Sequence, residues 1–200
     1  MKSYVTSASV VAVKNKNKTV IGVDKLLSYG RMSRYYTNQI FVHNQTALAF
    51  SGEYADIQEI IKFIKEEEAN EDSYFDSKSY FKMIQRYLYT MRSNFTPLNL
   101  ECVIGGVDFL GYVDYLGNFY ENDAISTKLG HHIVLPYLRE STEDPLIKVK
   151  NSLELLYKKD CKSSNEIQIA VITEEGVTIS DEKIIVNWEC GKSPEEILYV

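Results

Sequence analysis

Residues 8–24 read Ala-Ser-Val-Val-Ala-Val-Lys-Asn-Lys-Asn-Lys-Thr-Val-Ile-Gly-Val-Asp, which is two apolar runs separated by a polar turn. Such a pattern predicts a β-hairpin. Because each run is apolar at successive positions, both faces of the hairpin must be covered by other parts of the protein. Residues 47–50 form a third run of the same character. The sequence therefore predicts a sheet enclosed within a layered structure.

Helical patterns follow these strands. Ile57, Ile60, Ile61 and Ile64 recur at the spacing of one helix face. Residues 81–91 repeat the pattern, and Asp76 or Ser77 would cap that second helix. The remaining elements that we expect are strands at 102–107, 110–114, 118–126, 167–172 and 177–179, a short helix at 134–138, and a helix from Pro145.

This order of elements lacks the regular alternation of strand and helix that marks a doubly wound parallel sheet. Two sheets packed face to face, each with a helical layer outside, would bury every apolar strand face. We therefore predict an α+β fold, a four-layer αββα sandwich, formed by residues 1–187. Residues 188–200 show no periodicity of their own and are predicted to be a tail that contacts a neighbour.

The composition narrows the functional class. With 22 Lys and Arg against 28 Asp and Glu in 200 residues, the net charge is −6, so no basic excess is available to neutralise phosphates. No apolar run approaches the roughly 18 residues of a membrane span, and the first residues lack a secretory signal. Three widely spaced cysteines suggest reduced thiols. We expect no nucleic acid, no membrane, and a location in the cytoplasm and nucleus.

Candidate cofactor sites are weak. His131-His132 has no Cys or carboxylate at ligand spacing, and His43 is the sole further histidine. Gly105-Gly106 suits close strand packing better than phosphate binding. For Cys161, a thiol without a chemical role is a better interpretation than a nucleophile. We expect neither a metal nor a cofactor.

Four segments in order resemble proteasome β subunits. Residues 6–24 resemble the first two strands of that family, and residues 48–56 and 156–164 resemble two of its strand and helix junctions. The segment 129–139, Leu-Gly-His-His-Ile-Val-Leu-Pro-Tyr-Leu-Arg, resembles the type-7 kind, called type-4 in mammalian naming. The resemblance implies the N-terminal-nucleophile hydrolase fold and assembly with other proteasome α and β subunits in four stacked seven-membered rings.

In active members of that family, an N-terminal Thr is the nucleophile and its own amine is the base. The resemblance places four residues of this chain at active-site positions: Thr6, Asp24, Asp160 and Ser163. Thr6, however, follows Val5 where active members have Gly. The lysine of active members is also missing, since no Lys lies between Lys25 and Lys62. We expect the four positions to be vestigial, with no ammonium group close to Thr6.

The resulting hypothesis is a non-catalytic structural β subunit that completes its ring and helps to join half-particles, within a complex that degrades proteins. Its expected contact residues are His131, His132, Ile133, Trp188, Ile197, Leu198 and Tyr199. The main alternative is an active threonine protease subunit after trimming to Thr6. An α-type subunit, a free-standing hydrolase of the same fold and a small-ligand binding module stay open as further alternatives.

Overall fold

The computed structural model describes residues 4–7, 9–30, 33–70 and 75–186. The helices are α1 (Tyr54–Asn70), α2 (Ser77–Ser93), α3 (Gly130–Ile133), α4 (Leu135–Glu140) and α5 (Pro145–Lys159). The strands are β1 (Val5–Ser7), β2 (Val10–Lys14), β3 (Thr19–Asp24), β4 (Leu26–Tyr29), β5 (Ser33–Tyr36), β6 (Ile40–His43), β7 (Thr46–Gly52), β8 (Leu100–Gly105), β9 (Leu110–Val113), β10 (Phe119–Glu121), β11 (Ala124–Ser126), β12 (Glu166–Thr173) and β13 (Gly176–Lys183).

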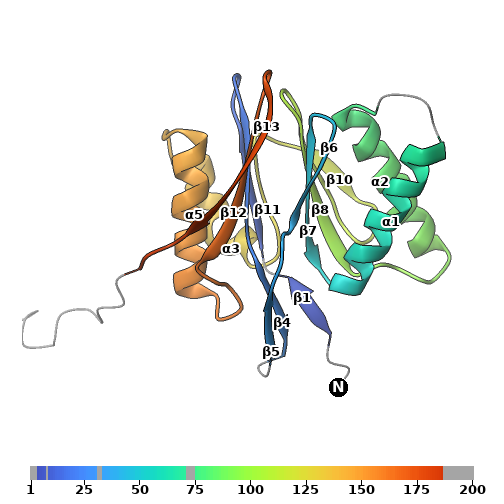
Figure 1. The fold of residues 1–200 in the computed structure, drawn as a ribbon, viewed down its shortest axis with the longest axis horizontal. Helices are drawn as coiled ribbons and strands as arrows, with labels where there is room; N and C mark the ends of the chain where they lie inside the picture. Colours follow the sequence, from blue (N-terminus) through green and yellow to red (C-terminus); the bar gives the residue numbers. More distant parts are fainter. Residues whose placement is uncertain (1–3, 8, 31–32, 71–74, 187–200) are drawn as a thin grey trace, which may run out of the picture.

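These elements form four layers (Figure 1). One five-stranded sheet has the order β10-β9-β8-β7-β6 and is covered on its outer face by α1 and α2. The other has the order β11-β2-β3-β12-β13 and is covered by α3, α4 and α5. Three hydrophobic clusters correspond to the three boundaries between layers. The predicted αββα sandwich is confirmed.

The β2–β3 hairpin lies at the centre of its sheet, as its apolar runs predict. The two strands pair antiparallel from Val10 opposite Val23 to Lys14 opposite Thr19. All six residues of β3 are buried, because β2 and β12 flank the strand and layers cover both faces. Gly22 allows α5 to approach closely, since a β-carbon there would lie 2.4 Å from Val149 Cγ1.

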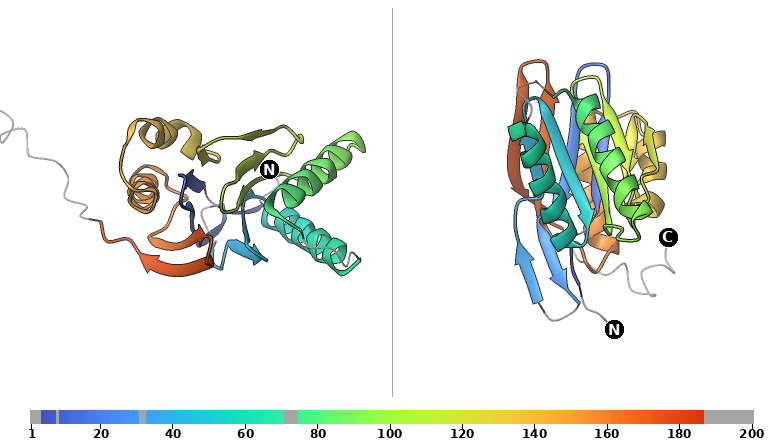
Figure 2. Two further views of the ribbon diagram at one scale, coloured as in Figure 1. Left: turned by 90° about the horizontal axis from the view of Figure 1, so that it is seen from above. Right: turned by 90° about the vertical axis from the view of Figure 1, so that its right-hand side faces the viewer.

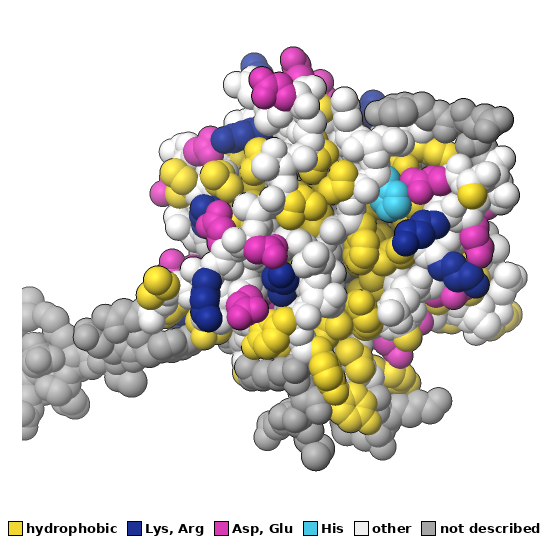
Figure 3. Space-filling model, viewed as in Figure 1, with side chains coloured by type: hydrophobic (Ala, Val, Ile, Leu, Met, Phe, Trp, Pro, Cys, Tyr) yellow, Lys and Arg dark blue, Asp and Glu magenta, His cyan; other side chains and the backbone are white. Residues whose placement is uncertain are grey.

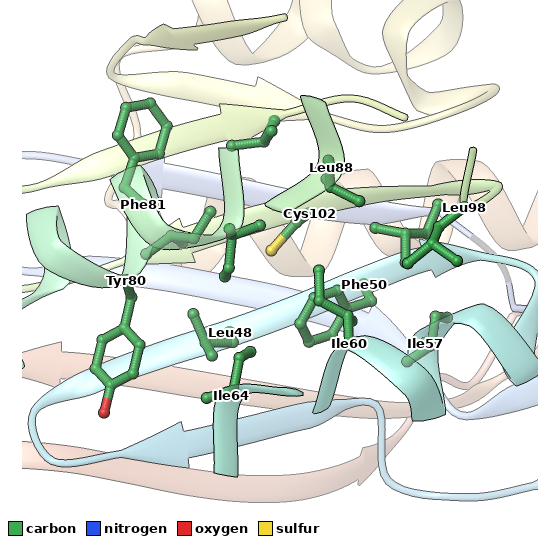
Figure 4. Close-up of a cluster of buried hydrophobic side chains, with 14 of the residues drawn as sticks. Leu48, Phe50, Ile57, Ile60, Ile64, Tyr80, Phe81, Leu88, Leu98 and Cys102 are labelled. Atoms are coloured by element: carbon green, nitrogen blue, oxygen red, sulfur yellow. The ribbon is translucent and has the colours of Figure 1, made fainter. Parts of the chain in front are cut away.

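The predicted helices α1 and α2 cover the other sheet. Ile57, Ile60 and Ile64 of α1 are fully buried against Leu48 and Phe50 of β7 (Figure 4). Asp76 is the N-cap of α2, where its side chain accepts a 2.7 Å hydrogen bond from the Ser79 N–H. On the opposite side of the molecule, Pro145 stands in the first turn of α5 as expected.

A small third sheet extends beyond one end of the sandwich (Figure 2). It has the order β1-β4-β5, and the apolar patterns predicted none of its three strands. Its strands pair antiparallel, with Thr6 opposite Ser28. This sheet carries Thr6, the first of the four predicted site residues.

Two sequence predictions need correction. The single strand expected at 118–126 is two strands, since β10 pairs with β9 in one sheet and β11 pairs with β2 in the other. The chain crosses between the sheets at residues 122–123, where Asn122 N–H binds the Leu110 carbonyl and Asp123 accepts from the Lys14 N–H. The single short helix expected at 134–138 is the pair α3 and α4, which meet at Val134.

The division into a domain at 1–187 and a tail at 188–200 stays a prediction, because residues 187–200 lie outside the described part of the chain. No helix within the described residues is both long enough and apolar enough to cross a membrane.

Candidate functional site

Thr6 lies in the middle of strand β1 and is held on both sides. It pairs with Ser28 of β4 across the small sheet, and a β-bridge joins it to Glu53 on the other side. The Thr6 Oγ1 and Ser28 Oγ atoms are 3.4 Å apart. A neutral hydroxyl such as that of Ser28 is a poor base, so this contact does not activate the Thr6 oxygen as a nucleophile.

Ser7 anchors β1 to the main sandwich. Its hydroxyl accepts a 3.1 Å hydrogen bond from the Gly52 N–H and lies 3.5 Å from the Phe50 carbonyl, both on β7. The side chain of Ser7 is buried. Strand β1 is therefore tied to the end of β7 by the residue that directly follows Thr6.

Asp24 ends strand β3 and is almost completely buried, with 3% of its surface exposed. Its Oδ2 accepts a 2.6 Å hydrogen bond from Ser163 Oγ, and its Oδ1 accepts a 3.0 Å hydrogen bond from the Leu26 N–H. Burial raises the pKa of Asp24 to about 7, although these hydrogen bonds act in the opposite direction. Near neutral pH this carboxyl group is therefore divided between its charged and neutral forms.

Asp160 and Ser163 belong to the loop after α5. Asp160 is the C-cap residue of that helix, and its Oδ1 accepts a 2.9 Å hydrogen bond from the Lys162 N–H. The Asp160 carbonyl accepts from the Ser163 N–H, which closes the loop into a turn. The negative charge of Asp160 adds to the rise in the pKa of Asp24.

The structure thus brings together three of the four predicted positions. Asp24 and Ser163 are in direct contact, and Asp160 acts on Asp24 electrostatically. Among the described residues, the Thr6 hydroxyl makes no hydrogen bond to any of these three side chains. Its contact is with Ser28, which the sequence analysis did not single out.

The sequence analysis expected no ammonium group close to Thr6, and the structure brings one to the main chain of the residue that follows Thr6. Lys128 follows β11, and its Nζ donates a 2.5 Å hydrogen bond to the carbonyl oxygen of Ser7. Burial lowers the pKa of Lys128 to about 8, while the nearby Glu101, Asp24 and Asp160 act to raise it. The sequence analysis sought the cation before β6, where active members carry it, whereas this cation comes from a segment more than eighty positions further along the chain.

Glu101 on β8 organises the segment around Lys128. Its Oε2 accepts a 3.1 Å hydrogen bond from the Lys128 N–H and lies 3.9 Å from His131 Nε2. The His131 ring packs edge-on against Tyr112, with the ring centroids 5.6 Å apart. Burial, and then the Glu101 carboxylate, raise the pKa of Tyr112. One carboxylate therefore connects the lysine to the start of α3.

The predicted contact residues differ in their surroundings. His131 is partly enclosed by Tyr112 and Glu101, His132 is exposed, and Ile133 packs in part against the cluster beneath α5. The other four, Trp188, Ile197, Leu198 and Tyr199, lie outside the described residues.

Lys128, Glu101 and Ser28 are the site residues that sequence reasoning missed. No periodic pattern marks them, since each depends on which strand ends meet. The one local signal is that Lys128 lies two positions after the strand segment at 124–126. Within the described residues, no group of three or more His, Cys, Asp or Glu side chains is placed to hold a metal ion.

Comparison with known proteins gives a consistent result. The family described as proteasome subunit matches residues 4–172. The chain is 35% identical to the probable proteasome subunit beta type-7 of Encephalitozoon cuniculi, over an alignment that covers 99% of each chain. It is 34% identical to the proteasome subunit beta type-4 of Dictyostelium discoideum, covering 94% of this chain and 81% of the relative. The type-7 subunit of Saccharomyces cerevisiae is 29% identical, covering 94% and 82%.

Proposed function

Because this chain belongs to the proteasome subunit family, we propose that it serves the core particle as a β subunit with a structural role and no proteolytic activity of its own. The relatives named as β type-7 and type-4 subunits support the assignment to the β class. Its partners are the other α and β subunits of the core particle. The whole particle degrades proteins, and this chain contributes surfaces to it.

The observation that carries this proposal is the position of Thr6 inside a paired strand. Val5 and Ser7, its two neighbours in the chain, both pair with β4. Wherever Val5 is retained, the nitrogen of Thr6 is a peptide nitrogen, which is not basic. An N-terminal nucleophile needs a free α-amine, because that amine accepts the hydroxyl proton. Without a base, the reaction loses the rate enhancement of about 10²–10⁴ that a positioned acid–base group provides.

The surroundings of Asp24 also fit a structural role better than a catalytic one. Its two oxygens already accept from Ser163 and from the Leu26 N–H. Its pKa, raised to about 7, means that part of the population carries no charge near neutral pH. A neutral carboxyl group does not stabilise a neighbouring ammonium, so the electrostatic support of a nucleophile is weak here.

A subunit of this kind acts through its exterior. We infer that α3, with His131, His132 and Ile133, faces the opposite β ring and helps to join half-particles. The exposed His132 and the 39%-exposed Leu129 on the same segment leave apolar and polar surface available for such a contact. We also propose that residues 188–200 extend onto a neighbouring subunit, because Ile197 to Val200 is an apolar end.

Hydrophobic side chains also gather at the lower end of the molecule, over the small sheet (Figure 3). They include Tyr29, Tyr35 and Tyr36, each between 41% and 57% exposed. Exposed aromatic groups of this kind are enriched in protein interfaces. They support a role within an assembly, which a ring of heterologous contacts provides.

We further propose that the chain works in the cytoplasm and nucleus. The support is the sequence, whose three cysteines are an odd number at wide spacing, a pattern that suits reduced thiols better than a disulfide framework. Imaging of a chain tagged at its natural locus tests this, and accumulation in a secretory compartment would contradict it.

The test of the structural role uses the core particle purified from its natural source. The intact mass of this chain is measured, and the particle is treated with a threonine-directed covalent inhibitor. We expect the other β subunits that carry a free N-terminal Thr to be labelled and this chain to stay unlabelled, which makes those subunits the internal control. A mature chain that begins at Thr6 and takes up the label would establish the alternative, an active protease subunit.

A further inference from the structure

Lys128 combines two features that are unusual for a lysine. Its backbone φ is 48°, in the left-handed region that non-glycine residues adopt at a cost. Its side chain also runs inward and brings the ammonium group to the Ser7 carbonyl. A strained backbone persists where the surroundings impose it, and it often marks a site with a specific task.

The conformation is fixed at both ends of the residue. At the backbone, the Lys128 N–H donates to Glu101 Oε2 at 3.1 Å. The carbonyl of Lys128 accepts from the His131 N–H in the first turn of α3. At the far end, the ammonium binds the carbonyl of Ser7, so one residue connects α3, β8 and β1.

The charges around the ammonium come from three elements. Glu101 on β8, Asp24 at the end of β3 and Asp160 after α5 attract it, while Lys162 repels it. None of these carboxylates belongs to the small sheet that carries Thr6. The ammonium therefore draws its electrostatic support from the main sandwich while it binds the main chain of β1.

We propose that Lys128 is a positioning residue that holds β1, and with it Thr6, against the sandwich by its hydrogen bond to the Ser7 carbonyl. This inference rests on the proposed function, because it gives the cation of the site a structural task. The ammonium binds the carbonyl of Ser7, and the hydroxyl of Thr6 contacts Ser28, so the cation supports the strand rather than the hydroxyl.

The physical role is local order and not overall stability. Burial of a charged group opposes folding, and surrounding carboxylates offset that cost only in part. The lowered pKa of Lys128 has the same origin. Removal of the ammonium is therefore expected to free β1 while leaving the main sandwich intact. The hydrogen bonds between β1 and β4 should open more often, and those of the β2–β3 hairpin should be unchanged.

The test is hydrogen exchange measured by mass spectrometry on the assembled core particle. Lys128→Asn removes the ammonium and keeps a residue that tolerates positive φ, whereas Lys128→Arg keeps the charge. We expect Lys128→Asn to raise exchange of the backbone amides in residues 5–7 and 26–29 by about tenfold. Lys128→Arg should restore most of the protection, and residues 19–24 serve as the internal control.

Unchanged exchange in Lys128→Asn, or an equal rise in both variants, would overturn the inference. If Lys128→Asn does not assemble, Glu101→Gln provides the second test, because it removes the charge that fixes the Lys128 backbone. A smaller rise at 5–7 and 26–29 is then expected, and no rise would count against the proposal. Covalent labelling of Thr6 in the unaltered particle would overturn the proposed function instead, so the two failures are distinct.

Discussion

Ser163 Oγ donates a 2.6 Å hydrogen bond to Asp24 Oδ2 across 139 positions of the chain. The contact joins the end of β3, at the centre of one sheet, to the loop that follows α5. Both side chains are buried, Asp24 with 3% and Ser163 with 6% of the surface exposed. Asp24 and Ser163, which occupy positions that resemble active-site positions of the family, thus link a strand to a helical layer.

The first prediction concerns the pH dependence that Asp24 confers. Its pKa is about 7 in the folded chain against 3.8 as a reference, so the folded state holds a proton that the unfolded state has released. The stabilisation is complete below the unfolded value and is lost as the pH rises through the folded value. The free energy of unfolding should therefore fall by about 2–3 kcal/mol between about pH 5 and pH 7.

Asn at position 24 has no carboxyl proton to lose, so the free energy of unfolding of Asp24→Asn should lack this fall between about pH 5 and pH 7. Urea unfolding of the purified chain and of Asp24→Asn, followed by circular dichroism across the same pH range, gives the difference between the two. As the pH rises, the free energy of unfolding of the unaltered chain should fall relative to that of Asp24→Asn. Parallel curves would show that Asp24 is ionised throughout.

The second prediction is that Ser163→Ala destabilises the fold. The substitution leaves a buried carboxyl oxygen without its donor, which costs about 1–3 kcal/mol. Since that hydrogen bond lowers the pKa of Asp24, its loss should also move the pH transition upward. The matched control is Ser93→Ala, whose exposed hydroxyl binds the Tyr89 carbonyl at the end of α2. Equal effects of the two variants in urea unfolding would show that burial of the Asp24–Ser163 link is irrelevant.

The third prediction tests the close approach of α5 to the central hairpin. In Gly22→Ala, the new β-carbon would lie 2.4 Å from Val149 Cγ1 and 2.8 Å from Leu153 Cδ1, so the helix must shift. Overpacking of this kind costs about 1–3 kcal/mol. Ser180→Ala on the exposed part of β13 is the control, with an expected change within about 0.5 kcal/mol. A thermal midpoint in Gly22→Ala that matches the control would contradict the packing argument.

The layers of this fold were predictable because burial on both faces leaves a readable pattern. The runs at 10–13 and 20–23 are apolar throughout, and Ile57, Ile60 and Ile64 mark a helix face, so the sandwich follows from hydrophobic periodicity. The small sheet was not predictable in this way, because Tyr35 and Tyr36 of β5 are large apolar side chains that the structure leaves exposed. The division of 118–126 was missed because β10 is exposed and β11 is buried, within one short segment.

The site was predictable in part for a similar reason. Asp24, Asp160 and Ser163 were located through the resemblance, and their proximity follows from the shared fold. Lys128 was not, because its task depends on a backbone φ of 48° and on the meeting of three elements. A search for a lysine at the family position could not find a cation that comes from the segment between β11 and α3.

The fourth prediction concerns the tail. Deletion of residues 190–200 should slow the joining of half-particles and leave the chain folded, because the apolar end from Ile197 to Val200 is proposed to contact a neighbour. Native gels of the assembling particle would show an accumulated half-particle band. Replacement of the same residues by an equal length of Gly and Ser is the control for chain length. If the deletion assembles at the normal rate, the end of the chain behaves as an ordinary frayed terminus.

The fifth prediction separates the two histidines at the start of α3. His131 is held by its own chain, 3.9 Å from Glu101 and against the Tyr112 ring, whereas His132 is exposed. If α3 faces the opposite ring, His132→Ala should weaken half-particle joining by about tenfold while it leaves the stability of the chain unchanged. His131→Ala should lower stability as well, because it removes the ring that packs on Tyr112.

Glu175→Ala in the exposed turn between β12 and β13 is the control for a surface change away from α3. The ratio of half-particles to complete particles on native gels is measured for each variant at equal concentration. Among the described residues, His132 has neither the Glu101 nor the Tyr112 contact of His131, so an effect of His132→Ala on assembly without a loss of stability would indicate a contact with another subunit. Normal assembly of the double variant His131→Ala/His132→Ala would place the joining surface elsewhere on the subunit.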